Sequence, residues 1–172
     1  MNGVKELREE PKIELRRLTT ADAEAFFWLI KNNLGPLEKS EGAGEKIDVT
    51  LELVQNMFNE DTETVRMGIF KEGDLIGHIN LMPQTADTAA IAYLVDADAR
   101  KNTLGIADMA FKQFLRAVPE QYRVLEASVK RDNTASQKFL RRSGFVFKEN
   151  IKDEHVDNVV YRYYLPGRQG RN

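Results

Sequence analysis

The stretch of sequence that decides the fold is Asn133-Thr134-Ala135-Ser136-Gln137-Lys138-Phe139-Leu140-Arg141-Arg142-Ser143-Gly144-Phe145. Asp132 or Asn133 is a suitable capping residue for a helix, because the side-chain oxygen of either can accept a hydrogen bond from a free amide of the first turn. Ala135 and Phe139 then share one face at helical spacing. Gly144 supplies the left-handed residue that ends the helix. The stretch therefore predicts a short capped helix, followed by a strand that starts at Phe145.

Composition limits the classes of protein that remain possible. The chain has 172 residues, enough for one domain with a proper core. Its 25 basic and 27 acidic residues give a net charge of −2, which argues against a general nucleic-acid binder. It has no apolar run of about 18 residues, so we expect no membrane span. With a charged N-terminus that does not resemble a secretory signal and with no cysteine, we expect a cytoplasmic protein.

The order of the expected elements predicts the fold class. We expect a flexible leader at 1–11, one domain at 12–166 and a polar tail at 167–172. Within the domain, strands are expected at 13–17, 64–70, 75–82, 88–95, 123–129, 145–151 and 159–165, and helices after Thr19 or Thr20, after Thr50, at 104–118 and at 134–142. The result is an α/β (α+β) fold with about seven strands in a mixed sheet, flanked by four helices.

Two connecting regions bear on function. The first helix is expected to present Ala21, Ala25, Trp28 and Leu29 on its apolar face. After it, residues 35–48 are rich in Gly, Glu, Lys and Ser and predict a loop. Residues 96–103 are polar and also predict a loop.

The quoted stretch also resembles a family signature. The pattern Asn133-x-x-Ser136-x-x-Phe139, followed by Gly144-Phe145, resembles a motif of the GCN5-related N-acetyltransferase (GNAT) superfamily. The order of elements over residues 12–166 is similar to the GNAT fold. Residues 75–81, LIGHINL, and residues 91–95, IAYLV, are most similar to the branch that holds the ribosomal-protein N-terminal acetyltransferases. The resemblance implies transfer of an acetyl group from acetyl-CoA to a primary amine.

The resemblance also implies a site for coenzyme A. In the family, a helix start of the form Gln/Arg-x-x-Gly-x-Gly/Ala binds the pyrophosphate, because free amides and the helix dipole attract anions. The spacing of this motif fits residues 102–107, NTLGIA, with Asn102 in place of the Gln or Arg. In a second alignment, counted from Tyr93, Arg100 takes that place and the loop has two extra residues. In both alignments the loop has one glycine fewer than the common form. The implied cofactor contacts are Leu94, Val95, Arg100, Lys101, Asn102, Thr103, Leu104, Gly105, Ile106, Ala107, Asn133, Ser136 and Phe139.

Ser136 is our candidate for the proton donor to the departing thiolate. Many relatives carry a tyrosine four residues further on, but Leu140 stands there in this chain. Relatives that act on ribosomal-protein termini carry a serine where Ser136 lies. The alternatives are a helix serine bonded to a backbone carbonyl, or a donor role for Tyr161 or Tyr163.

The general base has three candidates. The strand glutamate common in this branch falls at Ala90, which has no acid. We expect a water relayed through Glu126 or through the acidic hairpin at 153–157, which could also rim the acceptor site, with His78 as a competing candidate. Each of the two single residues also has a structural interpretation: a solvated strand residue for Glu126, and a hydrogen-bonded strand residue for His78. No metal site is expected, since the two histidines are far apart in sequence.

The sequence leaves three hypotheses for the acceptor of the acetyl group. Our first hypothesis is the N-terminal amine of a protein or peptide. The second is a small amine, such as an aminoglycoside, a polyamine or an amino acid conjugate. The third is a GNAT-like binding or regulatory module without catalysis, suggested by the altered phosphate loop and by Ala90. We expect a monomer or a homodimer that contacts no membrane.

Overall fold

The structure is a computed structural model, and it describes residues 12–34, 48–102 and 105–168. The predicted leader at 1–11, nearly all of the predicted loop at 35–48, and the end of the predicted tail lie outside the described residues, as do Thr103 and Leu104.

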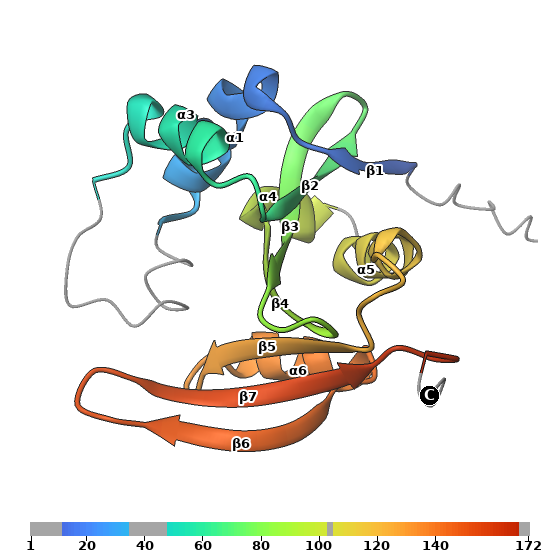
Figure 1. Ribbon diagram of the computed structural model, residues 1–172. Helices are drawn as coiled ribbons and strands as arrows, with labels where there is room; N and C mark the ends of the chain where they lie inside the picture. Colours follow the sequence, from blue (N-terminus) through green and yellow to red (C-terminus); the bar gives the residue numbers. More distant parts are fainter. Residues whose placement is uncertain (1–11, 35–47, 103–104, 169–172) are drawn as a thin grey trace, which may run out of the picture.

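One seven-stranded sheet forms the centre of the molecule (Figure 1). Its strand order is β1-β2-β3-β4-β5-β7-β6, and only the β4–β5 pair is parallel. The predicted mixed sheet is therefore confirmed. The strands are β1 Ile13–Arg17, β2 Val65–Lys71, β3 Asp74–Pro83, β4 Thr88–Val95, β5 Val124–Lys130, β6 Val146–Lys152 and β7 Asp157–Tyr164.

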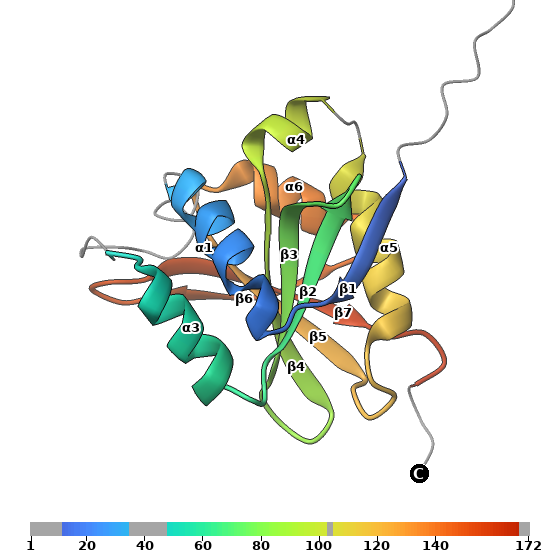
Figure 2. The ribbon, with the colours of Figure 1, turned by 90° about the horizontal axis from the view of Figure 1, so that it is seen from above.

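Helices cover both faces of the sheet (Figure 2). One face carries α1 (Ala23–Asn32) and α3 (Leu51–Glu60), and the other carries α5 (Ile106–Ala117) and α6 (Thr134–Arg142). The short 3-10 turn η1 (Thr20–Asp22) precedes α1. We call these the α1/α3 face and the α5/α6 face. Each has its own core: Phe26, Phe27, Val54 and Phe70 belong to the smaller one, and Phe111, Phe114, Leu140 and Tyr161 to the larger.

One predicted loop is in part a helix. The segment expected as a polar loop at 96–103 contains α4 (Ala97–Asn102), so the described residues hold five α-helices where four were expected. The helix starts on a partner that is remote in sequence, because the amide of Ala97 donates to Oδ1 of Asn33, 3.2 Å away. Asn33 itself is only 2% exposed and donates from Nδ2 to the carbonyl of Leu29. The buried end of α1 thus fixes the start of α4.

The predicted apolar face of the first helix was right for Leu29, which is buried, and wrong for its other three residues. Ala21 and Ala25 are exposed, and the Trp28 side chain is 49% exposed. Besides Leu29, the helix buries Ala23, Phe26 and Phe27. Ala21 lies in the 3-10 turn η1, whose tighter winding puts it out of phase with α1. Ala25 and Trp28 lie within α1 itself, at about 100° and 160° around the helix from buried Phe26.

Residues 133–145 contain the predicted capped helix, but Ala135, expected on the face of Phe139, is exposed, and the next strand starts one residue later than predicted, at Val146. Oδ1 of Asn133 accepts a hydrogen bond from the amide of Ser136 at 3.1 Å, which caps α6. Gly144 has a φ of 98°, so it ends the helix in the left-handed conformation. Because Phe139 and Leu140 are both buried, α6 is held firmly against the sheet.

Candidate active site

The sheet opens between β4 and β5. These parallel strands pair only through Thr88–Ala90 and Val124–Glu126, although β4 continues to Val95 and β5 to Lys130. On its other side, β4 stays paired with β3 up to Val95. The described parts of the two strands therefore leave backbone groups facing a gap in the ladder. The structure places Leu94 and Val95 at the open end of this split, where the resemblance expected them.

Gly77 lets β3 and β4 stay close at that end. A Cβ atom on Gly77 would lie 2.6 Å from the carbonyl oxygen of Leu94 and 3.2 Å from the Cα atom of Val95. Both are backbone atoms, so a side chain there would push β4 away from β3. The position of the split therefore depends on this glycine.

Ser136 lies in the first turn of α6, on the α5/α6 face of the split. Its hydroxyl is hydrogen-bonded to the hydroxyl of Tyr93, which comes from β4. The Tyr93 ring packs on Phe139 with 5.0 Å between ring centroids. Burial raises the pKa of Tyr93 to about 12, against a smaller lowering by the Ser136 hydrogen bond, so Tyr93 keeps its proton at all ordinary pH values. Sequence reasoning did not single out Tyr93, since a tyrosine in an apolar strand is expected to be a core residue.

The two tyrosines predicted as alternative donors are engaged elsewhere. The hydroxyl of Tyr161 donates to Oε1 of Gln137 at 3.1 Å and accepts from Nη2 of Arg141 at 2.9 Å, and the residue is fully buried. Tyr163 packs edge-on against Phe111 at 5.8 Å. Both stabilise the packing of the sheet against its helices.

The start of α5 lies beyond the open end of β4. Gly105 precedes the helix with a φ of 75°, and its carbonyl accepts from the amide of Met109. Ile106 is buried and Ala107 half-buried, so their side chains turn inward. Arg100 and Lys101 are exposed at the end of α4, and Lys101 lies 3.7 Å from Asp98. An anion at this helix start would meet free amides with basic side chains nearby.

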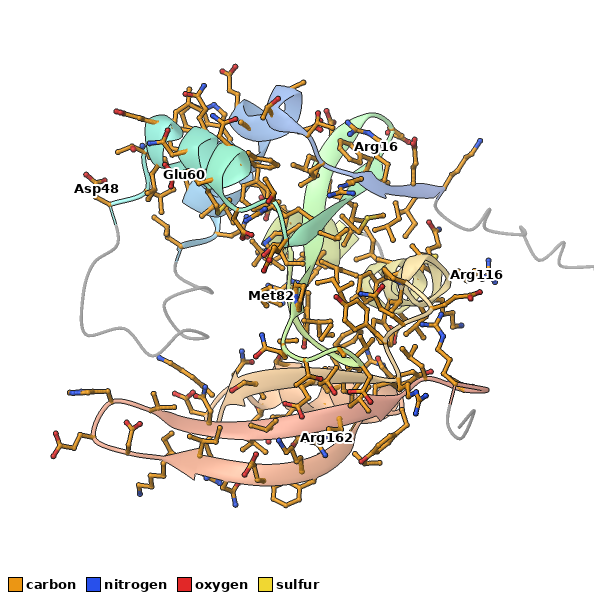
Figure 3. The ribbon with its side chains drawn as sticks, in the orientation of Figure 1. Arg16, Asp48, Glu60, Met82, Arg116 and Arg162 are labelled. Carbon is orange, nitrogen blue, oxygen red and sulfur yellow. The ribbon has the colours of Figure 1, made fainter. Side chains whose placement is uncertain are left out.

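Glu126 lies on the opposite, α1/α3 face. In the parallel register it is the direct partner of Ala90, so its carboxylate is one strand away from the position where the branch carries a glutamate. Oε1 accepts hydrogen bonds from Nε of Arg162 at 2.7 Å and from Nζ of Lys148 at 3.2 Å. Arg162 comes from β7 and is labelled in Figure 3. Partial burial of Glu126 by itself raises its pKa, but the two cations outweigh burial, and the pKa lies below its ordinary value.

His78 is also on the α1/α3 face, but it is covered by α1. The residue is 5% exposed, and its ring lies 5.0 Å from the ring of Phe26. Nδ1 is 3.1 Å from Oδ1 of Asn80, and Nε2 is buried without a hydrogen-bond partner among the described residues. Burial lowers the pKa of His78 to about 4, against a smaller rise from the Asn80 hydrogen bond. His78 is therefore neutral at neutral pH.

Two acidic residues of the hairpin at 153–157 stabilise the hairpin itself. Oδ1 of Asp153 accepts from the amides of His155 and Val156, and Asp157 forms an ion pair with Arg131 at 2.7 Å. Among the described residues, no group of three or more acidic or histidine side chains is arranged to hold a metal ion. Within the same residues, no helix has the length and apolar character to cross a membrane.

The site therefore has two sides. Ser136 and Tyr93 approach the split from the α5/α6 face, and Glu126 stands on the α1/α3 face, where the segments before and after the undescribed residues 35–47 also lie.

A family model for an acetyltransferase (GNAT) domain matches residues 12–146, most of the chain. The chain belongs to the GNAT acetyltransferase family. The predicted superfamily is confirmed, and the chain is an N-acetyltransferase of this family.

Solved structures share the fold. RimL, a ribosomal L7/L12 alpha-N-protein acetyltransferase in complex with coenzyme A, has a TM-score of 0.74 at 19% identity, over 89% of this chain and 94% of that chain. The ribosomal-protein-S5-alanine acetyltransferase of Vibrio fischeri has a TM-score of 0.74 at 15% identity, over 92% and 96%. The spermidine N-acetyltransferase of Vibrio cholerae, with CoA and spermine, has a TM-score of 0.74 at 15% identity, over 92% and 98%. A search of curated proteins finds no matching sequence.

Proposed function

We propose that this enzyme acetylates the N-terminal amine of a protein or peptide. The observation that carries the proposal is the charge around Glu126, where Arg162 and Lys148 both contact the carboxylate. A polyamine brings several positive charges and needs an excess of acidic groups, but here Arg162 and Lys148 balance Glu126 and Glu149. A peptide N-terminus brings one positive charge and needs no such excess. The similarity of residues 75–81 and 91–95 to the ribosomal-protein branch supports the same choice.

We assign the acetyl-CoA site to the α5/α6 side of the split. The start of α5 at Gly105 offers free amides to the pyrophosphate, and Arg100 and Lys101 add positive charge. Leu94 and Val95 offer backbone groups to the pantetheine arm, as an added strand would use them. The other expected contacts with the cofactor stay predictions; they are Asn102, Thr103, Leu104, Ile106, Ala107, Asn133 and Phe139.

The chemistry then uses both faces of the sheet. The neutral amine attacks the thioester carbon from the α1/α3 face, and the carbon–sulfur bond breaks with its electron pair going to sulfur. Ser136 gives its proton to this thiolate and takes a proton back from solvent, so that the serine is neutral again for the next cycle. The attacking nitrogen loses its proton to a water held by Glu126, whose lowered pKa keeps it charged. His78 is buried behind Phe26 and is assigned a structural role.

A thiol-release assay tests the acceptor. Because the chain has no cysteine, a thiol reagent detects only the coenzyme A that the reaction releases. The probes are hexapeptides with a free N-terminus and each residue type in the first position, the same peptides with a blocked N-terminus, spermidine, an aminoglycoside and a series of amino acid amides. We expect turnover of a subset of the free peptides only. Faster turnover of spermidine, the aminoglycoside or the amides would replace the proposal by a small-molecule acceptor, and acetyl-CoA binding without any turnover would favour a regulatory module.

Gly105→Trp should weaken acetyl-CoA binding at least about 10-fold, measured by calorimetric titration. The bulky side chain would stand where the pyrophosphate approaches the first amides of α5. Gly73→Trp is the matched control, because Gly73 also has a positive φ, of 92°, and its Cβ position is equally open, but it lies in the β2–β3 turn. Equal weakening by both substitutions would mean that backbone strain, rather than the phosphate site, is responsible.

Glu126→Gln should lower the turnover of the best peptide about 10-fold near neutral pH. The effect is smaller than for a full general base, because the lowered pKa makes Glu126 a weak base. Glu149→Gln is the control, since Glu149 also contacts Lys148, at 2.9 Å, but lies on the outer strand β6. The pH profile of turnover is measured for both variants. If the Glu126 variant keeps the wild-type rate and the same fall in rate on the acidic side of the profile, the amine arrives already neutral.

We also propose that the enzyme works in the cytoplasm, where acetyl-CoA and new protein N-termini are both available. The predicted choice between a monomer and a homodimer stays open to measurement by sedimentation.

A further inference from the structure

The hydroxyl groups of Tyr93 and Ser136 meet at the split from two separate elements. Tyr93 stands on β4 between Ala92 and Leu94, and Ser136 stands in the first turn of α6, 43 residues further along the chain. The Tyr93 hydroxyl contacts Oγ of Ser136 and also lies 3.5 Å from the backbone carbonyl oxygen of Ser136, the longer of the two contacts. Tyr93 is the described side chain that holds the Ser136 hydroxyl.

Both residues are fixed by further contacts. The Ser136 amide is held by Oδ1 of Asn133 at 3.1 Å, so the backbone of the serine cannot shift within the turn. The Tyr93 ring packs on Phe139 from the next turn of the same helix, with 5.0 Å between centroids. The serine is thus held at its amide by Asn133 and at its hydroxyl by Tyr93.

The direction of the hydrogen bond decides what Ser136 can do. Each hydroxyl has one hydrogen. If Ser136 donates to Tyr93, its hydrogen is used and cannot reach the sulfur. If Tyr93 donates to Ser136, the serine hydrogen stays available to a second acceptor. Tyr93 is largely buried and keeps its proton, so it is able to donate at every pH at which the enzyme works.

We propose that Tyr93 is a positioning residue that donates its hydrogen bond to Ser136 and so directs the serine hydrogen to the sulfur of coenzyme A. The proposal rests on the assignment of Ser136 as the proton donor. It assigns to Tyr93 a role that the motif around Ser136 does not reveal. Tyr93 itself does not touch the sulfur; it acts through Ser136.

The proposal makes a prediction about coenzyme A that needs no acceptor. A serine hydroxyl aimed at the sulfur donates to a thiolate more strongly than to a thiol, so the bound thiol should ionise more easily. A hydrogen bond to a charged group is strong enough to lower the thiol pKa by about one unit. Acetyl-CoA has no thiol, so its binding should not share this pH dependence.

The experiment is calorimetric titration of the full chain with coenzyme A and with acetyl-CoA over a series of pH values from neutral to alkaline. In the wild type, coenzyme A should begin to bind more tightly than acetyl-CoA about one pH unit below the ionisation of the free thiol. Tyr93→Phe and Ser136→Ala should each abolish this tightening, because a bound thiol with the pKa of the free thiol gives no pH-dependent change in affinity, and the double variant should show no further change. Acetyl-CoA affinity should stay within about 2-fold of wild type in all three.

Tyr161→Phe is the matched control. Tyr161 also holds α6 from a neighbouring strand by a buried hydroxyl, through Gln137, but it does not contact Ser136. It should lower thermal stability and leave the onset unchanged. An onset that is the same in the wild type and in Tyr93→Phe would overturn the proposal, as would an equal loss of the tightening in Tyr161→Phe. Failure of the peptide assay with a normal titration would instead reject only the proposed acceptor.

Discussion

Ser136→Ala is expected to lower the turnover of the best peptide about 10²-fold, the scale of general acid catalysis, while the dissociation constant of acetyl-CoA stays unchanged. The reason is that the hydroxyl matters most when negative charge develops on the departing sulfur, after the thioester has bound. The backbone of α6 should keep its cap, because the Asn133 hydrogen bond goes to the Ser136 amide and not to its side chain. Single-turnover and steady-state rates with the same peptide would separate chemistry from product release.

Ser143→Ala provides the control on the same helix. Ser143 follows the last turn of α6, and its hydroxyl is buried without a hydrogen-bond partner among the described residues. Its removal should leave turnover within about 2-fold of wild type. If Ser136→Ala also keeps the wild-type rate, the thiolate leaves without help from this helix and the proton comes from water.

The local parts of the fold were predictable from the sequence. Asn133 and Gly144 bracket α6, and Thr50 caps α3 by accepting from the amide of Leu53 at 3.1 Å. Each of these contacts spans a few residues, so the residue types at fixed spacing are enough to predict it. The order of strands and helices follows from such local signals.

The parts that could not be predicted depend on partners far away in the chain. The start of α4 is bound by Asn33, 64 residues before Ala97. The one local signal is Asp96, whose Oδ2 lies 3.4 Å from the amide of Asp98. Glu126 was identified as a candidate from its place on a strand, but its two cations lie 22 and 36 residues away. Those cations determine whether the carboxylate is a strong or a weak base.

The candidate catalytic residues show the same division. Ser136 was proposed as a proton donor because a family pattern and a local helix start coincide there. Tyr93 was not found, because its hydroxyl is paired across 43 residues and its strand is otherwise apolar. A buried tyrosine hydroxyl needs a partner, and that requirement is the one signal that would have drawn attention to it.

His78 should dominate the loss of stability in mild acid. The pKa of a histidine is 6.5 in the unfolded chain and about 4 for His78 in the folded protein, mainly because burial disfavours the charged ring. Above pH 6.5, both states are neutral and His78 has no effect. As the pH falls from 6.5 to 4, the unfolded state takes up a proton that the folded state refuses, so the free energy of unfolding falls. The full difference is about 3 kcal/mol at about 1.4 kcal/mol per pKa unit.

The surroundings of His78 explain why the ring stays neutral. Phe26 covers it from α1, the positive charge of Arg66 also lowers its pKa, and Asn80 offsets only part of this. Carboxylates titrate in a separate range. The pKa values of Asp22 and Asp61 are lowered to about 2, chiefly by hydrogen bonds from Arg16 and from Thr64 respectively, so both stabilise the fold above pH 3.8 and lose this effect between 3.8 and about 2.

Urea unfolding of His78→Gln and His155→Gln between pH 7 and about pH 4.5 isolates the effect of His78. The chain has only these two histidines, and His155 is exposed in the β6–β7 turn. We expect the wild type and His155→Gln to lose on the order of 3 kcal/mol over this range, and His78→Gln to lose much less, because glutamine does not titrate. Each variant is compared with itself at neutral pH, so any constant cost of the substitution cancels. An equal slope in all three proteins would show that His78 takes up its proton in the folded state, and that α1 moves away from the sheet in mild acid to admit it.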